Sequence, residues 1–166
     1  MREDCLATQE HTDGGSVHVW GAINYGGRCA LRVIEGNVNA RTYKEILEVN
    51  LLPYAREQFQ DNFVYQDDNA PPHRARLVRQ FLDDNDVTRL DWPSKSPDLN
   101  PIENIWAHLQ FRISSRRPSA ESLPQLAQYL VEEWDRIPLP IINRVVDSMP
   151  RRVQAVIAAR GRSTKY

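Results

Sequence analysis

Two short segments of the chain place carboxylates where an enzyme could use them. The first segment, residues 66–71, contains Asp68, and the second, residues 96–104, contains Glu103. The 34 residues 69–102 lie between these two carboxylates. Carboxylates on neighbouring elements can bind Mg²⁺, which uses one or two protein carboxylates together with substrate phosphate. A metal held in this way can promote the cutting or joining of phosphodiester bonds.

Both carboxylates also have a simpler explanation. Glu103 follows Asn100 by three residues, with Pro101 at the first helical position, so it can complete a capping box. From the local sequence alone, capping is favoured over catalysis for Glu103. Asp68 belongs to an Asp-Asp-Asn sequence that is typical of turns. Because successive strand residues face opposite ways, only one of Asp67 and Asp68 is expected to face a crevice.

The histidines and cysteines do not indicate a second kind of site. His73 and His108 each lie five residues beyond a candidate carboxylate, but they match no recognised zinc-ligand spacing. We expect His73 to border the site and His108 to face solvent or pack. Cys5 and Cys29 are too few for a disulfide framework or a cysteine-built zinc site, which indicates a reduced intracellular setting.

The composition predicts one soluble domain. The chain has 166 residues, of which 41% are hydrophobic and 26% charged. It contains no apolar run of about 20 residues, so no membrane span is expected, and its N-terminus has no secretory signal pattern. Residues 111–166 hold ten basic and five acidic side chains, whereas residues 1–110 hold eleven and seventeen.

This charge asymmetry has two explanations that the sequence does not separate. An acidic body would attract divalent cations and a basic tail could contact phosphate, or both could be ordinary solvated surface. The tail residues that could contact nucleic acid are Arg112, Arg116, Arg117, Arg151 and Arg152. Arg151 and Arg152 could equally form an exposed helix face.

The elements that must position these residues follow from periodicity and turn signals. Residues 17–23 and 29–34 alternate as strands and form a hairpin. Short apolar runs predict strands at 63–66 and 87–92. Helical spacing predicts helices at about 40–57, 73–84, 101–113, 123–134, 140–148 and 150–160. Residues 1–16 are polar and aperiodic, and they are expected to be a poorly ordered lead-in.

Strands joined through helices indicate an α/β fold, with a mixed sheet flanked by helices and a helical C-terminal tail. Ligand sites in such folds lie beyond the carboxyl ends of strands, and Asp68 lies at such an end. Glu103 lies in the first turn of the helix after the next strand. The two carboxylates could therefore face each other across one crevice.

Several segments resemble the Tc1/mariner transposase family. Residues 66–73 are similar to its QDNAPxH segment, and residues 92–106 are similar to its WPaxSPDLNPIEnxW segment. Residues 17–23 match its vmvWGai strand, and residues 148–156 and 164–166 resemble its C-terminal end. The similarity covers nearly the whole chain, and the two central motifs are highly specific.

The resemblance implies an RNase H-like fold with a DDE metal site that uses Mg²⁺ or Mn²⁺. In the Tc1 branch the second Asp and the Glu are separated by the number of residues found here. By that match, Asp68 is the second catalytic, metal-binding carboxylate and Glu103 is the third. Glu103 could then cap its helix and also bind metal.

The chain departs from the family at its N-terminal end. The family's first catalytic Asp lies on the strand before the Trp20 strand, whereas only sixteen mostly polar residues precede Val17 here. Asp4 and Asp13 do not lie on a strand pattern. We therefore expect a domain that lacks the first strand, with weakened metal binding and impaired catalysis. The family's N-terminal helix-turn-helix modules are also expected to be absent.

The expected organisation is a lead-in at 1–16, a truncated RNase H-like DDE domain at 17–115 and a helical extension of it at 116–166. The resemblance implies DNA as partner, a nuclear location, and a possible homodimer or association with a full-length transposase subunit. The alternative is a non-catalytic DNA-binding or interaction module that uses the basic tail from Arg112 onward. A remnant without a cellular role is the third possibility.

Overall fold

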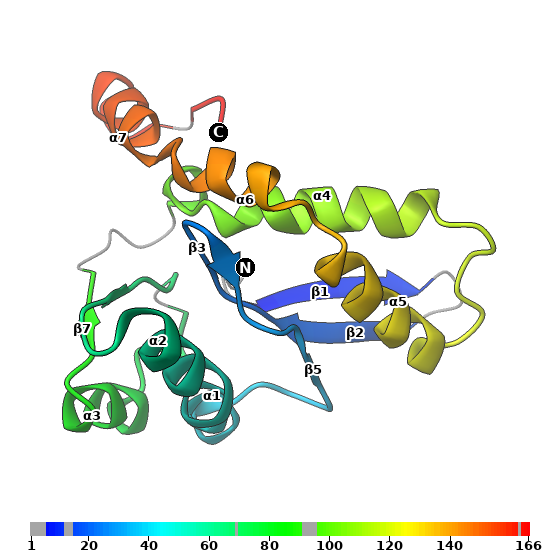
Figure 1. Cartoon of the computed structure of the whole chain (residues 1–166), viewed down its shortest axis with the longest axis horizontal. Helices are drawn as coiled ribbons and strands as arrows, with labels where there is room; N and C mark the ends of the chain where they lie inside the picture. Colours follow the sequence, from blue (N-terminus) through cyan, green and yellow to red (C-terminus); the bar gives the residue numbers. More distant parts are fainter. Residues whose placement is uncertain (1–5, 12–14, 69, 91–95, 163) are drawn as a thin grey trace.

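The structure is a computed structural model, and it has helices packed around small sheets (Figure 1). The antiparallel sheet contains β1 (Leu6–His11), β2 (Gly15–Trp20) and β5 (Arg32–Ile34), with β2 in the middle. The alternation of helices and strands along the chain confirms the expected α/β class. The residues that the structure describes are 6–11, 15–68, 70–90, 96–162 and 164–166.

Strand β1 corrects the prediction of a poorly ordered lead-in. It pairs with β2 along its whole length, from Leu6 opposite Trp20 to His11 opposite Gly15. Pairing with a neighbour supplies the backbone hydrogen bonds, so a strand can form where its own sequence shows no alternation. No aspartate occurs within Leu6–His11. Asp4 and Asp13 lie outside the described residues.

A second sheet positions Asp68, the first candidate carboxylate, which follows one of its strands. Strands β6 (Val64–Tyr65) and β7 (Thr88–Arg89) are parallel, and α3 (Arg76–Asp84) connects them. Within the described ranges no strand pairing joins this sheet to the antiparallel one. A separate small hairpin consists of β3 (Ile23–Asn24) and β4 (Gly27–Arg28).

The predicted helix at 40–57 is interrupted by a wide turn. It consists of α1 (Ala40–Ile46), the π-helical η1 (Leu47–Leu51) and α2 (Leu52–Phe59). Asn39 caps α1 as predicted, because its side chain accepts the N–H groups of Arg41 and Thr42. Pro53 near the start of α2 has no N–H to donate, and the wide turn precedes it.

The remaining helices agree closely with the sequence prediction. After the short 3₁₀ helix η2 (Pro97–Leu99), α4 begins one residue later than expected. Gly161 follows the last helix with a φ of 75°, a conformation that favours glycine. No helix in the described part of the chain is both long and apolar enough to cross a membrane. These helices are α4 (Ile102–Ser115), α5 (Leu123–Asp135), α6 (Leu139–Val146) and α7 (Met149–Ala158).

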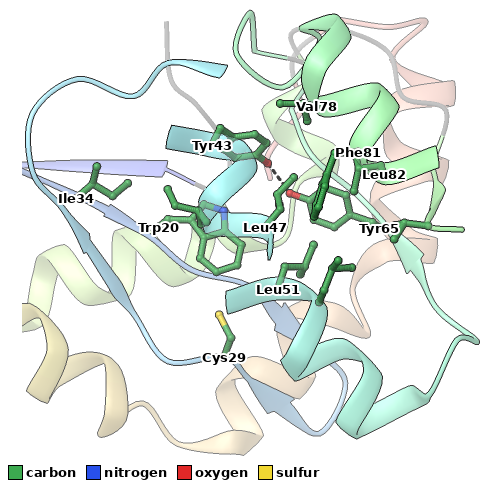
Figure 2. Packing of buried hydrophobic residues seen from close by; sticks show 13 residues of the cluster. Trp20, Cys29, Ile34, Tyr43, Leu47, Leu51, Tyr65, Val78, Phe81 and Leu82 are labelled. Atoms are coloured by element: carbon green, nitrogen blue, oxygen red, sulfur yellow. Dashed lines mark hydrogen bonds between the residues drawn. The ribbon is translucent and has the colours of Figure 1, made fainter. Parts of the chain in front are cut away.

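Strand β2 separates two hydrophobic cores. Its Trp20 belongs to a cluster with α1, η1, α3 and β6, which Figure 2 shows from close by. Its Val17 and Val19 belong to a second cluster with α4, α5 and α6. Because side chains alternate across a strand, one strand can serve both cores. In the first core the hydroxyls of Tyr43 and Tyr65 lie 2.5 Å apart.

The two cores meet just after β2. A Cβ on Gly21 would lie 2.9 Å from the Trp134 ring and 3.0 Å from the Trp106 ring, so only glycine fits without displacing them. The Trp134 indole N–H donates to the Cys29 carbonyl at 2.9 Å, while the Cys29 side chain is buried in the first core. This hydrogen bond connects α5 of the second core to Cys29 of the first core.

Candidate metal centre

Asp68 lies just beyond the carboxyl end of β6, as predicted. Its Oδ1 accepts the Ala70 N–H at 2.7 Å, which is the local bonding typical of an aspartate in a turn. The same Oδ1 lies 2.7 Å from Nδ1 of His73. The Asp68 side chain is only 6% exposed. The Ala70 hydrogen bond therefore orients this carboxylate, and His73 lies against the same oxygen.

His73 is the buried neighbour of Asp68. Its side chain is 0% exposed, and its ring stacks on Tyr43 of α1 with centroids 3.8 Å apart. The contact of Nδ1 with Asp68 is close, but Nδ1 does not meet hydrogen-bond geometry, and among the residues that the structure describes Nε2 has no hydrogen-bond partner. His73 thus borders the site as expected, and α1 holds its ring in place.

Asp67 points to a different partner. Its side chain is 2% exposed, and its carboxylate accepts a hydrogen bond from Arg89 of β7 at 2.8 Å. Ligand atoms of Asp67, Asp68 and His73 lie within 4.8 Å of one another, which is close enough to surround a cation. However, the Arg89 charge already compensates Asp67 and would repel a metal beside it. Asp67 is therefore a structural residue of the site.

Glu103 lies in the first turn of α4 and is half-buried. It is not part of the group formed by Asp67, Asp68 and His73. The structure nevertheless brings the two motifs together, because the Gln66 side-chain amide donates to the Leu99 carbonyl at 3.3 Å. Gln66 and residues 100–102 also line the same cavity of about 340 Å³. The segments that carry Asp68 and Glu103 are thus neighbours.

Two of the five arginines predicted to contact nucleic acid join α4 to α5. Arg112 and Arg116 contact the buried Glu133 at 2.5 and 3.2 Å, and Arg116 also contacts Glu132 at 2.5 Å. Burial acts to raise the pKa of Glu133, but hydrogen bonds and charges from Arg112 and Arg136 outweigh it and hold that pKa below 4.5. The hydrogen bond to Glu132 raises the pKa of Arg116.

The burial of Arg152 argues against the predicted contact with phosphate. This residue is 2% exposed and donates to the Ser148 hydroxyl, the Asp98 carbonyl and the Asn104 side chain. Burial lowers the pKa of its guanidinium. Its role is to connect α7 with η2 and α4.

Arg151 and Arg117 are exposed. Arg117 also donates to the carbonyls of Ser114 and Arg116. Phosphate contact stays a prediction for these two arginines. Arg89 was not identified from the sequence. The strand predicted at 87–92 was expected to lie beside the strand that ends at Asp67. A basic residue on it, opposite in charge to Asp67, is the signal that could have pointed to Arg89.

Comparison with known proteins agrees with this geometry. Residues 2–126 match the family model of the DDE superfamily endonucleases. The chain is 40% identical over 161 residues to the Tcb2 transposase of Caenorhabditis briggsae, covering 97% of the chain and 58% of that protein. It is 41% identical over 153 residues to the Tc1 transposase of Caenorhabditis elegans, covering 92% and 55%. The chain thus spans a little over half the length of these relatives.

Solved structures with the same fold come from the Mos1 transposase. The Mos1 catalytic domain with Raltegravir and Mg matches with a TM-score of 0.84 at 20% identity, covering 96% of this chain and 83% of that one. The Mos1 mariner paired-end complex with Mn matches with a TM-score of 0.79 at 20% identity, covering 96% and 48%. The fold is therefore RNase H-like. Since fold and family model agree, the chain belongs to the DDE superfamily endonucleases.

Proposed function

We propose that this chain contains a transposase DDE domain that acts on DNA, with Asp68 and Glu103 as two of its metal-binding carboxylates. The observation that carries the proposal is the fixed Asp68 carboxylate. Its Oδ1 is held by Ala70 and His73 at the end of β6, beside the motif that contains Glu103. The named relatives are transposases, and a nuclear location is part of the same proposal.

The residues present fit a hard divalent cation. Mg²⁺ and Mn²⁺ prefer oxygen ligands, and Asp68 and Glu103 supply carboxylates from neighbouring segments. A bound cation would activate the attacking oxygen and stabilise the leaving oxygen of a phosphodiester. The chain's own residues orient Asp68 through Ala70 and His73, while Arg89 keeps Asp67 engaged elsewhere. Relatives solved with Mg and with Mn support this choice of metals.

We further propose that metal binding is weak and cleavage is impaired. The described strand before β2, Leu6–His11, contains no aspartate that could act as a third carboxylate. Two ligands hold a cation less firmly than three. Catalysis is sensitive to small misplacements of reacting groups, so a loosely held metal lowers the rate strongly.

Metal binding and DNA nicking test the proposal directly. Mn²⁺ binding is followed by electron paramagnetic resonance, and nicking of supercoiled plasmid is followed by gel electrophoresis. We expect Asp68→Ala and Glu103→Ala each to reduce the Mn²⁺ affinity about tenfold or more, as loss of a metal-site interaction typically does. The matched control Asp61→Ala, at a side chain that is 84% exposed, should bind Mn²⁺ normally. Equal affinity in all four proteins would sink the proposal.

The alternative function, DNA binding by the basic tail, is weakened by the structure. Arg112 and Arg116 are held by acidic partners, and Arg152 is buried. The tail keeps exposed arginines, among them Arg151 and Arg162. A module of this kind would bind DNA without Mg²⁺ and lose affinity steeply with salt.

A further inference from the structure

A second group of arginines lies directly after the Asp68 motif. Arg74, Arg76 and Arg79 are all exposed. Their side chains make no ion pair and no side-chain hydrogen bond with any residue that the structure describes. Arg89, Arg112 and Arg116, in contrast, each contact a carboxylate. The three exposed arginines therefore present uncompensated positive charge to solvent.

Backbone hydrogen bonds tie this arginine group to the candidate metal centre. The Ala70 N–H donates to Asp68 Oδ1 at 2.7 Å, and the Arg74 N–H donates to the Ala70 carbonyl at 3.1 Å. The Arg79 N–H then donates to the Ala75 carbonyl at 3.1 Å, in the first turn of α3. The positions of the arginines are thus fixed relative to Asp68, and they do not lie on an independent loop.

The order of charges along α3 is opposite to the order that stabilises a helix. Arg76 and Arg79 lie at its N-terminal end, Asp83 and Asp84 lie at its C-terminal end, and its first turn contains no acidic residue. The N-terminal end of a helix carries partial positive charge, so cations there are unfavourable. A sequence that breaks a local rule commonly does so for function. Here the effect is to concentrate positive potential beside Asp68.

We propose that Arg74, Arg76 and Arg79 form a surface that binds the phosphate backbone of duplex DNA next to the metal centre. The inference rests on the proposed function, because it takes DNA as the substrate of that centre. Guanidinium groups bind phosphate through paired N–H donors. Arg76 and Arg79 are three residues apart on a helix, so their side chains are neighbours that can contact adjacent phosphates.

Charge reversal at two of these positions separates a role in binding from a role in folding. The variant R76E/R79E should bind a fluorescent DNA duplex about tenfold or more weakly at low salt. The slope of log affinity against log salt concentration is negative, and its magnitude should decrease by about 1.8 between about 50 and 200 mM salt, because two phosphate contacts are lost. Its thermal midpoint should be unchanged or higher, since glutamates suit the start of α3.

The matched control is R32E/R41E, which makes the same change in charge at two exposed arginines that lie outside α3 and outside the basic tail. It should keep the salt slope of the wild type. An unchanged slope in R76E/R79E, or an equal loss in R32E/R41E, would overturn the inference. Mn²⁺ binding measured without DNA distinguishes the two proposals. If R76E/R79E keeps its DNA affinity while Asp68→Ala loses Mn²⁺, only the arginine surface is refuted. If no variant alters Mn²⁺ binding, the metal centre itself is refuted.

Discussion

Neighbouring residues of one motif have different roles at the candidate centre. Asp67 and Asp68 are adjacent in sequence, yet Asp67 pairs with Arg89 of β7 and Asp68 contacts His73. The difference comes from what lies beside each carboxylate, because Arg89 of β7 reaches Asp67 whereas His73 lies against Asp68. Asp67 stabilises the parallel sheet through Arg89, and Asp68 borders the motif that contains Glu103.

His73 is expected to orient Asp68 for metal binding. His73→Phe keeps a ring that can stack on Tyr43 but removes the nitrogen that contacts Asp68 Oδ1. We expect its Mn²⁺ affinity to fall about tenfold. His73→Asn, whose amide nitrogen can occupy the place of Nδ1, should restore part of that loss. Calorimetric Mn²⁺ titration measures both, and full affinity in His73→Phe would mean that the histidine only packs.

The sequence located the candidate residues but not their neighbours. That Asp68 and Glu103 bind metal stays a prediction, which follows from the resemblance of their motifs, while the position of His73 next to Asp68 agrees with the expectation that it borders them. The stacking of His73 on Tyr43 and the pairing of Asp67 with Arg89 did not follow, because each joins residues that are far apart in the chain. Such contacts depend on tertiary packing, which local patterns do not encode.

At the scale of elements, helices were predicted better than strands. Asn39 and Gly161 mark helix ends through their own side-chain and backbone chemistry, so these ends were readable. Strand β1 was missed because its pairing with β2 holds it in place. The π-helical turn at Leu47–Leu51 was also missed, since the hydrophobic spacing on both sides of it looks like one continuous helix.

The connection between α4 and α5 is expected to depend on Glu133. Glu133→Gln leaves Arg112, Arg116 and Arg136 without their shared carboxylate. The free energy of unfolding should fall by about 1–3 kcal/mol. This range already allows for solvent screening, because the arginines are partly exposed. Urea denaturation measures this change. Glu132→Gln, at a more exposed carboxylate, should have a clearly smaller effect, and equal effects would contradict a special role for Glu133.

The same carboxylate makes stability depend on pH. The pKa of Glu133 is lower in the folded chain than its ordinary value of 4.5. A carboxylate of this kind stabilises the fold fully above its unfolded pKa, and the stabilisation is lost as pH falls below 4.5 through the folded pKa. The wild type should therefore lose more stability than Glu133→Gln over that range. Parallel pH curves would contradict this expectation.

At the scale of the whole molecule, the C-terminal region contributes to the body of the fold. Figure 1 shows α4 and α5 beside β1 and β2, with α6 next to α4 and α7 continuing beyond the start of α4. The second core contains Val19 of β2, Leu130 of α5 and Ile142 of α6. The Thr164 N–H also donates to the Asp98 carboxylate at 2.5 Å. The segment that leads to Glu103 is therefore held by residues from the far end of the chain.

Two adjacent arginines test this dependence. Arg152→Ala should lower the free energy of unfolding by about 3 kcal/mol, because it removes a buried charge that donates to Ser148 at the start of α7, to η2 and to α4. Arg151→Ala, at an exposed neighbour, should lie within about 0.5 kcal/mol of the wild type. Thermal denaturation compares the two. If Arg152→Ala proved as stable as Arg151→Ala, the guanidinium would not hold these elements together.

Cys29 lies where the two cores meet, with its thiol in one and its carbonyl bonded to Trp134 of the other (Figure 2). Burial raises the pKa of this thiol to about 11, so almost no reactive thiolate is present at neutral pH. An alkylating reagent can reach the sulfur only when the cores separate. In a chain whose Cys5 is replaced by serine, the rate of alkylation would measure how often the two cores separate.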